Sequence, residues 1–129
     1  MRYLTRSLAL SALRRGKGVE QFLGAVDVAD VPAIRWVSVD PWNAHYRVSM
    51  DTVQDPDDEN FQNLSNLMPV DPTEEDYVGE GRELARVADE AEAIAYAESL
   101  AGAHPDRWVN FGMTGAEYAD LVRSRRPHA

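Results

Sequence analysis

Cysteine is absent from the 129 residues, and this absence removes several classes of function at once. Disulfide frameworks, thiolate zinc sites and cysteine nucleophiles all need the sulfur atom. Long apolar runs are missing too, since nothing approaches the about 20 residues of a membrane-spanning helix. The opening "MRYLTRSLALSALRRGKG" contains arginines and leucines, but cations follow where a signal-peptide cleavage site would lie. We therefore expect this segment to belong to the folded domain, and we expect a cytoplasmic protein without a membrane partner.

Cations are scarce in the middle of the chain. The segment from Met1 to Met50 contains seven Arg and Lys and four Asp and Glu. The segment from Asp51 to Glu92 contains two cations and fourteen acids, and the segment from Ala93 onward contains four of each. The sum is the net charge of −9. Such a charge disfavours nonspecific binding to nucleic acid or to anionic membrane, so we expect neither as a partner. The acidic middle is either a well-solvated loop or a surface for a partner.

Length and composition predict one domain over residues 1–129, with 44% apolar residues available for a core. The clearest element is a hairpin with arms at Ala33–Val39 and Tyr46–Met50, joined by a turn at "DPWN". Alternating apolar residues also favour a strand over Arg2–Leu13, although a helix fits the same residues. "VEQFLG" reads as a short helical turn that Gly24 ends.

The second half predicts a strand over Gly81–Val87 and then a helix capped by Asp89 and Glu92 and stopped at Gly102. A short buried strand around Trp108, Val109 and Phe111 should precede a last helix. That helix should begin with a second capping box, formed by Thr114 and Glu117. Strands and helices do not alternate regularly. We therefore predict an α+β fold, with two or three helices packed on one face of a mainly antiparallel sheet.

Motifs that would carry chemistry are weak. "DPDDENFQNLSN" spaces its first acids like calcium ligands, but Asn60 and Asn66 stand where the loop needs glycine and glutamate. The three histidines lack metal-ligand spacing, and neither a serine elbow nor a phosphate-binding loop occurs. We predict no enzyme activity, no metal and no cofactor. The alternative is a small enzyme or ligand-binding domain with a pocket near His45 and Arg47; a third possibility is an oligomer-forming subunit.

Aromatic residues stand within or near the acidic middle, where they could meet a basic partner by cation–π contact and ion pairing. Trp42, in the predicted turn, is a candidate anchor, whereas Trp36 and Trp108 are expected in the core. The residues predicted to contact a partner are Trp42, Asp55, Asp57, Asp58, Glu59, Glu74, Glu75, Asp76 and Tyr77.

Two segments, "LRRGKGVEQFLG" (Leu13–Gly24) and "RWVNFGMTGAEYADLV" (Arg107–Val122), resemble parts of small bacterial proteins encoded beside polymorphic or contact-dependent growth-inhibition toxins. The resemblance implies an immunity protein, which neutralises a toxin domain by binding it. It assigns no contact residues. Many such toxins are nucleases, and proteins that bind phosphate backbones are basic. An acidic inhibitor of a basic toxin domain is thus the leading hypothesis, with the oligomeric state left open.

Overall fold

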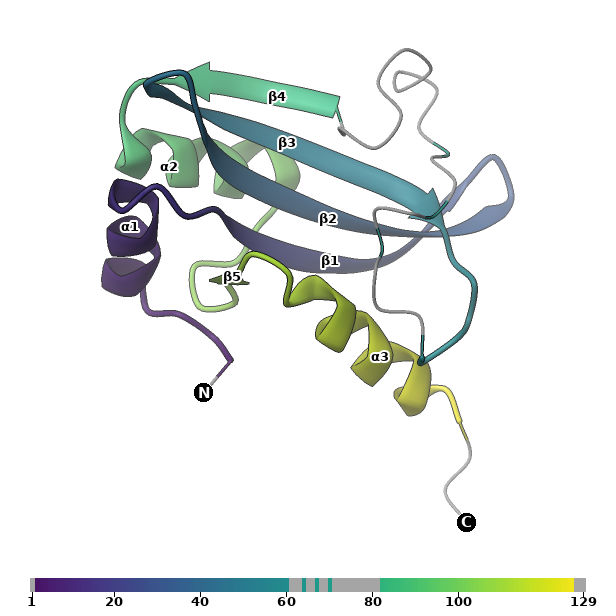
Figure 1. The fold of residues 1–129 in the computed structure, drawn as a ribbon. Coiled ribbons are helices and arrows are strands. Elements are labelled where there is room, and N and C mark those ends of the chain that lie inside the picture. Colours follow the sequence, from purple (N-terminus) through teal and green to yellow (C-terminus); the bar gives the residue numbers. More distant parts are fainter. Residues whose placement is uncertain (1, 61–63, 65–66, 68–69, 71–81, 127–129) are drawn as a thin grey trace.

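The computed structural model of the protein describes residues 2–60, 64, 67, 70 and 82–126. Among these residues, five strands form one antiparallel sheet in the order β4-β3-β2-β1-β5, and three helices cover it (Figure 1). This arrangement confirms the predicted α+β fold. The elements in chain order are α1 (Arg6–Arg14), β1 (Val19–Val28), β2 (Val31–Trp42), β3 (His45–Gln54), β4 (Arg82–Val87), α2 (Glu90–Ala101), β5 (Val109–Asn110) and α3 (Thr114–Ser124).

Both faces of the central strand β2 are buried. Val37 and Val39 belong to a core cluster with residues of α1 and α2. Ile34 and Trp36 point the other way, because side chains alternate along a strand, and they join a second cluster with α3. Two helices therefore share one face, as predicted, while α3 covers the opposite face. No helix in the described part of the chain is long and apolar enough to cross a membrane.

The segment Arg2–Leu13 is a helix from Arg6 onward, so the predicted strand was wrong. The Thr5 side chain caps α1 by accepting a hydrogen bond from the Leu8 N–H at 3.2 Å. Ala9, Ala12 and Leu13 recur at helical spacing and are all buried. The alternating residues suited a strand equally well locally, and packing against α2 and the sheet decides for the helix.

The segment "VEQFLG" lies within β1, so the predicted helical turn was also wrong. Strand β1 pairs with β2 at nine positions, a contact that local sequence cannot report. Gly24 does not end a helix. It has φ of +103° at a register shift between Phe22 and Gly24, where β1 bulges.

The predicted hairpin is confirmed as β2 and β3, and the predicted strand before the second helix is confirmed as β4, with Gly81 outside the described residues. The turn lies later than predicted: β2 continues through Trp42, and the two turn residues are Asn43 and Ala44, with φ of +47° and +66°. Positive φ at both central positions matches the twist of a two-residue hairpin. This shift leaves Trp42 at a strand end.

The predicted helix α2 is confirmed with both of its end signals. Asp89 accepts a hydrogen bond from the Glu92 N–H at 3.1 Å, and Gly102 is left-handed with φ of +75°. The second capping box was wrong, because Thr114 is the first residue inside α3 and its hydroxyl donates to Glu20 at 2.5 Å. Phe111 was expected to be buried but is 73% exposed, whereas Trp36 and Trp108 lie in the core as predicted.

Candidate functional site

The acidic loop, residues 55–60, follows β3 and lies against the C-terminal end of α3 (Figure 1). Asp55 makes the central contact. Its carboxylate accepts hydrogen bonds from the Tyr118 hydroxyl at 2.6 Å and from the Asp57 N–H at 2.8 Å. Arg125 forms an ion pair with it at 2.8 Å, and the Asp55 side chain is only 4% exposed. Asp55 thus fixes the loop to α3.

The environment of Asp55 favours its charged form. Burial by itself raises the pKa of this carboxyl, but the bonds from Tyr118, Asp57 and Arg125 outweigh burial and hold the pKa below the usual 3.8. The same contact acts on the phenol in the opposite direction. Burial and the adjacent Asp55 carboxylate raise the pKa of Tyr118 to about 12. At neutral pH the pair is therefore carboxylate and neutral phenol.

The other acids of the loop point outward, and two of them pair with exposed arginines. Asp57 lies 3.2 Å from Arg125 and 3.3 Å from Arg126, and Glu59 lies 3.0 Å from Arg123. Their side chains are 53% and 39% exposed. Asp58 is also exposed; its N–H donates to the Tyr118 hydroxyl at 3.3 Å and its carboxylate accepts from the Asn60 N–H at 2.9 Å.

A chain of ion pairs continues from the loop along α3. Charges alternate in it, and neighbouring members are 2.5 to 3.9 Å apart. It connects the acidic loop to the N-terminal segment and to the turn before β5. We call it the α3 charge ladder; its members in order are Glu59, Arg123, Asp120, Arg2, Glu117 and Arg107.

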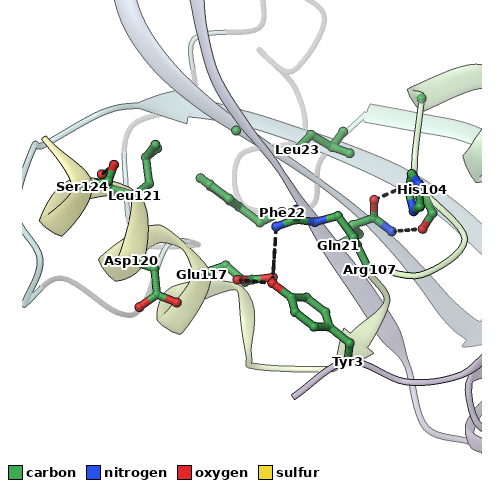
Figure 2. Close-up of a pocket in the computed structure, with 12 residues that line it drawn as sticks. Tyr3, Gln21, Phe22, Leu23, His104, Arg107, Glu117, Asp120, Leu121 and Ser124 are labelled. Carbon is green, nitrogen blue, oxygen red and sulfur yellow. Dashed lines mark hydrogen bonds and ion pairs between the residues drawn. The ribbon is translucent and has the colours of Figure 1, made fainter. Parts of the chain in front are cut away.

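The far end of the ladder borders a hollow of about 550 Å³ between β1, α3 and the segment after α2. Figure 2 shows Tyr3, Arg107 and Glu117 converging on its wall. The Glu117 carboxylate is 6% exposed and accepts from Arg2 at 2.8 Å and from the Tyr3 hydroxyl at 3.0 Å. Arg107 stacks over the Tyr3 ring at 5.4 Å. Burial and the bond to Glu117 raise the pKa of Tyr3.

Gln21 fixes another part of the wall of this hollow, at the point where β5 stops pairing with β1. Its amide nitrogen donates to the His104 carbonyl at 2.8 Å, and its amide oxygen accepts from the His104 N–H at 2.6 Å (Figure 2). The amide side chain thereby pairs with the His104 backbone in the way that the backbone of a neighbouring strand would. Phe22 and Leu121 add apolar surface. The polar groups of the wall are paired with one another.

The residues predicted to contact a partner do not form one surface. Trp42 is 48% exposed, with Arg86 over its ring at 5.8 Å, at the end of the sheet where the β2–β3 turn lies. The acidic loop begins at the other end of β3, about 33 Å away for a ten-residue strand. Glu74, Glu75, Asp76 and Tyr77 lie outside the described residues.

Asp55 also differs from the prediction, which placed it among the residues that contact a partner. As placed, its 4% exposed side chain is not available to a partner, because Tyr118 and Arg125 already occupy it. Sequence reasoning missed this role, and it also missed Arg2 and Glu117 as a pair. The two pairs join residues 70 and 115 positions apart, and no local signal connects such residues.

The alternative site shows polar contacts of its own. His45 is exposed, with Nδ1 3.2 Å from the Asn43 carbonyl, and the Arg47 side chain is 15% exposed and pairs with Glu83 at 3.2 Å. Arg47 also lies opposite Asp40 in the β2–β3 register. The hollow of Figure 2 is lined by other residues. Within the described ranges, no group of three or more His, Asp or Glu side chains is placed to hold a metal ion.

No family model matches this chain, and no curated protein or solved structure matches it either.

Proposed function

We propose that this protein is an immunity protein, a binding protein without catalysis that covers a basic toxin domain, of the nuclease type, with an acidic surface. The observation that supports this most directly is the anchored acidic loop. Because Asp55 is buried against Tyr118 and Arg125, the loop presents Asp57, Asp58 and Glu59 in one arrangement before any partner arrives. A preorganised surface loses less conformational entropy on binding than a loose one.

The charge of the surrounding sequence agrees with a basic partner. Residues 55–81 contain nine Asp and Glu and no Arg or Lys. A concentrated negative field attracts a cationic protein and can raise its association rate by orders of magnitude. The same field repels nucleic acid, so the inhibitor would not compete with its partner for the partner's own substrate.

Two further acids, which the prediction from sequence did not include, support a larger surface. The Asp55 N–H donates to the Pro32 carbonyl at 3.0 Å, so the acidic loop lies beside the turn that joins β1 to β2. Asp27 and Asp30 are exposed at this turn. The proposed surface thus combines two segments far apart in sequence, and Trp42 is not part of it.

The internal ion pairs at this surface do not block a partner. The pairs of Asp57 and Glu59 with the arginines at and just after the end of α3 are exposed, and exposed pairs contribute only about 0 to 1 kcal/mol. A toxin arginine or lysine can replace Arg123 or Arg126 at little cost. The released arginines then remain in solvent. Occlusion of the toxin's active site follows if that site lies within the basic surface.

The test is a pair of matched double charge reversals, with the basic toxin domain that the proposal expects beside this gene as the partner. Asp58→Lys with Glu59→Lys alters the proposed surface, and Glu92→Lys with Asp106→Lys alters exposed acids elsewhere. Each changes the net charge by +4. We expect the first variant to lower the association rate constant at least about tenfold and to flatten its salt dependence.

The control variant should lower the association rate constant by less than about threefold, since distant charges are screened over about 10 Å at ordinary ionic strength. Equal losses for the two variants would mean that only total charge matters. An unchanged rate for the first variant would reject this surface.

A further inference from the structure

Two cations in the turn between α1 and β1, Arg15 and Lys17, have no acidic partner among the described residues. Among the thirteen Arg and Lys of the chain, Arg15 and Lys17 form no ion pair with any described residue. Both are exposed in the turn between α1 and β1. In a chain of net charge −9, where arginines from both termini find internal acids, this adjacent unpaired couple stands out. It is complementary to an anion.

An exposed aromatic ring lies at the same place. Phe111 follows β5 and is 73% exposed, the highest value among the large apolar residues in the described part. Its backbone is nevertheless held firmly, since its N–H donates to the Gly18 carbonyl at 3.3 Å. The next residues are tied down by Glu20, which binds the Gly112 N–H and the Thr114 hydroxyl. The phenyl ring is therefore held in solvent at a defined place, where its face can stack on a flat ligand.

These groups line one hollow of about 500 Å³, formed by Arg15, Lys17, Gly18, Asn110 and Phe111. We call it the cationic hollow. Its volume lies within the range of small-molecule sites, about 300 to 1,000 Å³. It offers two positive charges, one amide that can both donate and accept hydrogen bonds, and one ring face for stacking.

We propose that the cationic hollow binds a small anion that carries an aromatic ring, with a mononucleotide as the representative ligand. The phosphate would lie between Arg15 and Lys17, where a charge-assisted bond to guanidinium is strong. The base would stack on Phe111, and the Asn110 amide would contact a base edge, the two modes by which proteins bind single bases. This site is independent of the proposed partner surface.

The ligand is small because of the charge of the whole molecule. A long polyanion would meet the field of net charge −9, whereas one phosphate group interacts mainly with its two neighbouring cations. We therefore expect AMP to bind and a ten-nucleotide single strand of DNA to bind no better than AMP. Tighter binding of the DNA strand would overturn the small-ligand proposal in favour of nucleic acid.

The test is calorimetric titration of the full chain with AMP, adenosine and inorganic phosphate. AMP should bind saturably, and adenosine and phosphate should each bind at least about tenfold more weakly, because each retains only one of the two contacts. Equal affinity for phosphate and AMP would leave an adventitious anion site only. No saturation by AMP at up to about 10 mM would reject the proposal outright, because a Kd above that value corresponds to a binding free energy weaker than about −2.7 kcal/mol.

Two variants assign the contacts. Phe111→Ala should weaken AMP binding about tenfold and leave phosphate binding unchanged, since only the stacking surface is lost. Arg15→Gln with Lys17→Gln should weaken both ligands about tenfold or more. The matched control is Arg6→Gln with Arg86→Gln, which removes two exposed but paired cations and should change AMP affinity less than about twofold. Equal effects of the two double variants would overturn the site, as would an unchanged affinity for Phe111→Ala.

Discussion

Two carboxylates, Asp55 and Glu20, have the same kinds of hydrogen-bond donor, but their pKa values are shifted in opposite directions. Each accepts a hydrogen bond from one hydroxyl and one backbone N–H, at the acidic loop and at the turn before α3 respectively. Their side chains are largely buried. Of the two, only Asp55 has a cation at ion-pair distance among the described residues, Arg125 at 2.8 Å. Two hydrogen bonds therefore do not offset the effect of burial on the pKa of Glu20, whereas the bonds from Tyr118, Asp57 and Arg125 together do so at Asp55.

The pKa values follow from this difference. Burial raises the pKa of Glu20 above 4.5; the bonds from Thr114 and Gly112 offset the rise only in part, and the nearby Asp40 charge adds to it. The pKa of Asp55 is held below 3.8. At neutral pH the charged form of Asp55 therefore stabilises the fold, and the charged form of Glu20 opposes it. The acidic loop is an ionic anchor, whereas the Glu20 contact is a hydrogen-bonded one.

The substitution Asp55→Asn should give the largest loss. It removes the charge that Arg125 and Tyr118 bind, and breaking a buried pair from one side costs about 3 kcal/mol. Because Arg125 is 33% exposed and can turn to water, we expect a fall of about 2 to 3 kcal/mol in the free energy of unfolding at pH 7. Urea unfolding measures it, and a loss below about 0.5 kcal/mol would be within the range of an ordinary surface substitution.

Tyr118→Phe should cost less, about 1 to 2 kcal/mol, because it removes one donor to Asp55 and the acceptor for the Asp58 N–H but keeps the ring in the core. Tyr96→Phe is the matched control: Tyr96 is 39% exposed, and no hydroxyl bond to the described residues is lost, so its effect should be near zero. Equal stability of the two variants would show that the Tyr118 hydroxyl does not hold the loop.

Glu20→Gln should have the smallest effect at pH 7, less than about 1 kcal/mol, because the amide can still bond Gly112 and Thr114 without a buried charge. The contributions of Glu20 and Asp55 to the free energy of unfolding depend on pH in opposite directions. The raised pKa means that the contribution of Glu20 is present at low pH and is lost as the pH rises above about 4.5. The contribution of Asp55 is present at neutral pH and is lost as the pH falls below about 3.8.

Unfolding of the wild type and of both variants between pH 3 and 7 measures these trends. As the pH rises, the free energy of unfolding of the wild type should increase relative to that of Asp55→Asn. Over the same range it should decrease relative to that of Glu20→Gln. Parallel pH profiles for the two variants would contradict the comparison.

Local signals were enough to predict part of this fold. The hairpin β2–β3, strand β4 and helix α2 with its caps at Asp89 and Gly102 all come from patterns within a few residues. The errors at α1 and β1 arose where a short segment suited two structures and a distant neighbour decided between them.

The candidate site was less predictable, because its contacts are long-range. The excess of acids in the middle of the chain was plain, yet Asp55 and Glu59 face arginines 70 and 64 residues away. Charges that are separated along the sequence are thus mixed in space. Trp42 does not lie near the acids for a related reason: it lies beside the first residue of β3, and the acids follow the last residue of that ten-residue strand.

The most direct test of the anchored loop is amide hydrogen exchange at Asp57 and Asp58, whose N–H groups donate to Asp55 and to the Tyr118 hydroxyl. If Asp55 fixes the loop, exchange at both amides should be slow in the wild type and at least about tenfold faster in Asp55→Asn, as expected when opening becomes easier by about 1.4 kcal/mol or more. The amides of β2 that pair with β3 should stay protected in both proteins. Equal exchange rates at Asp57 and Asp58 in the two proteins would contradict the anchor, and with it the preorganised acidic surface.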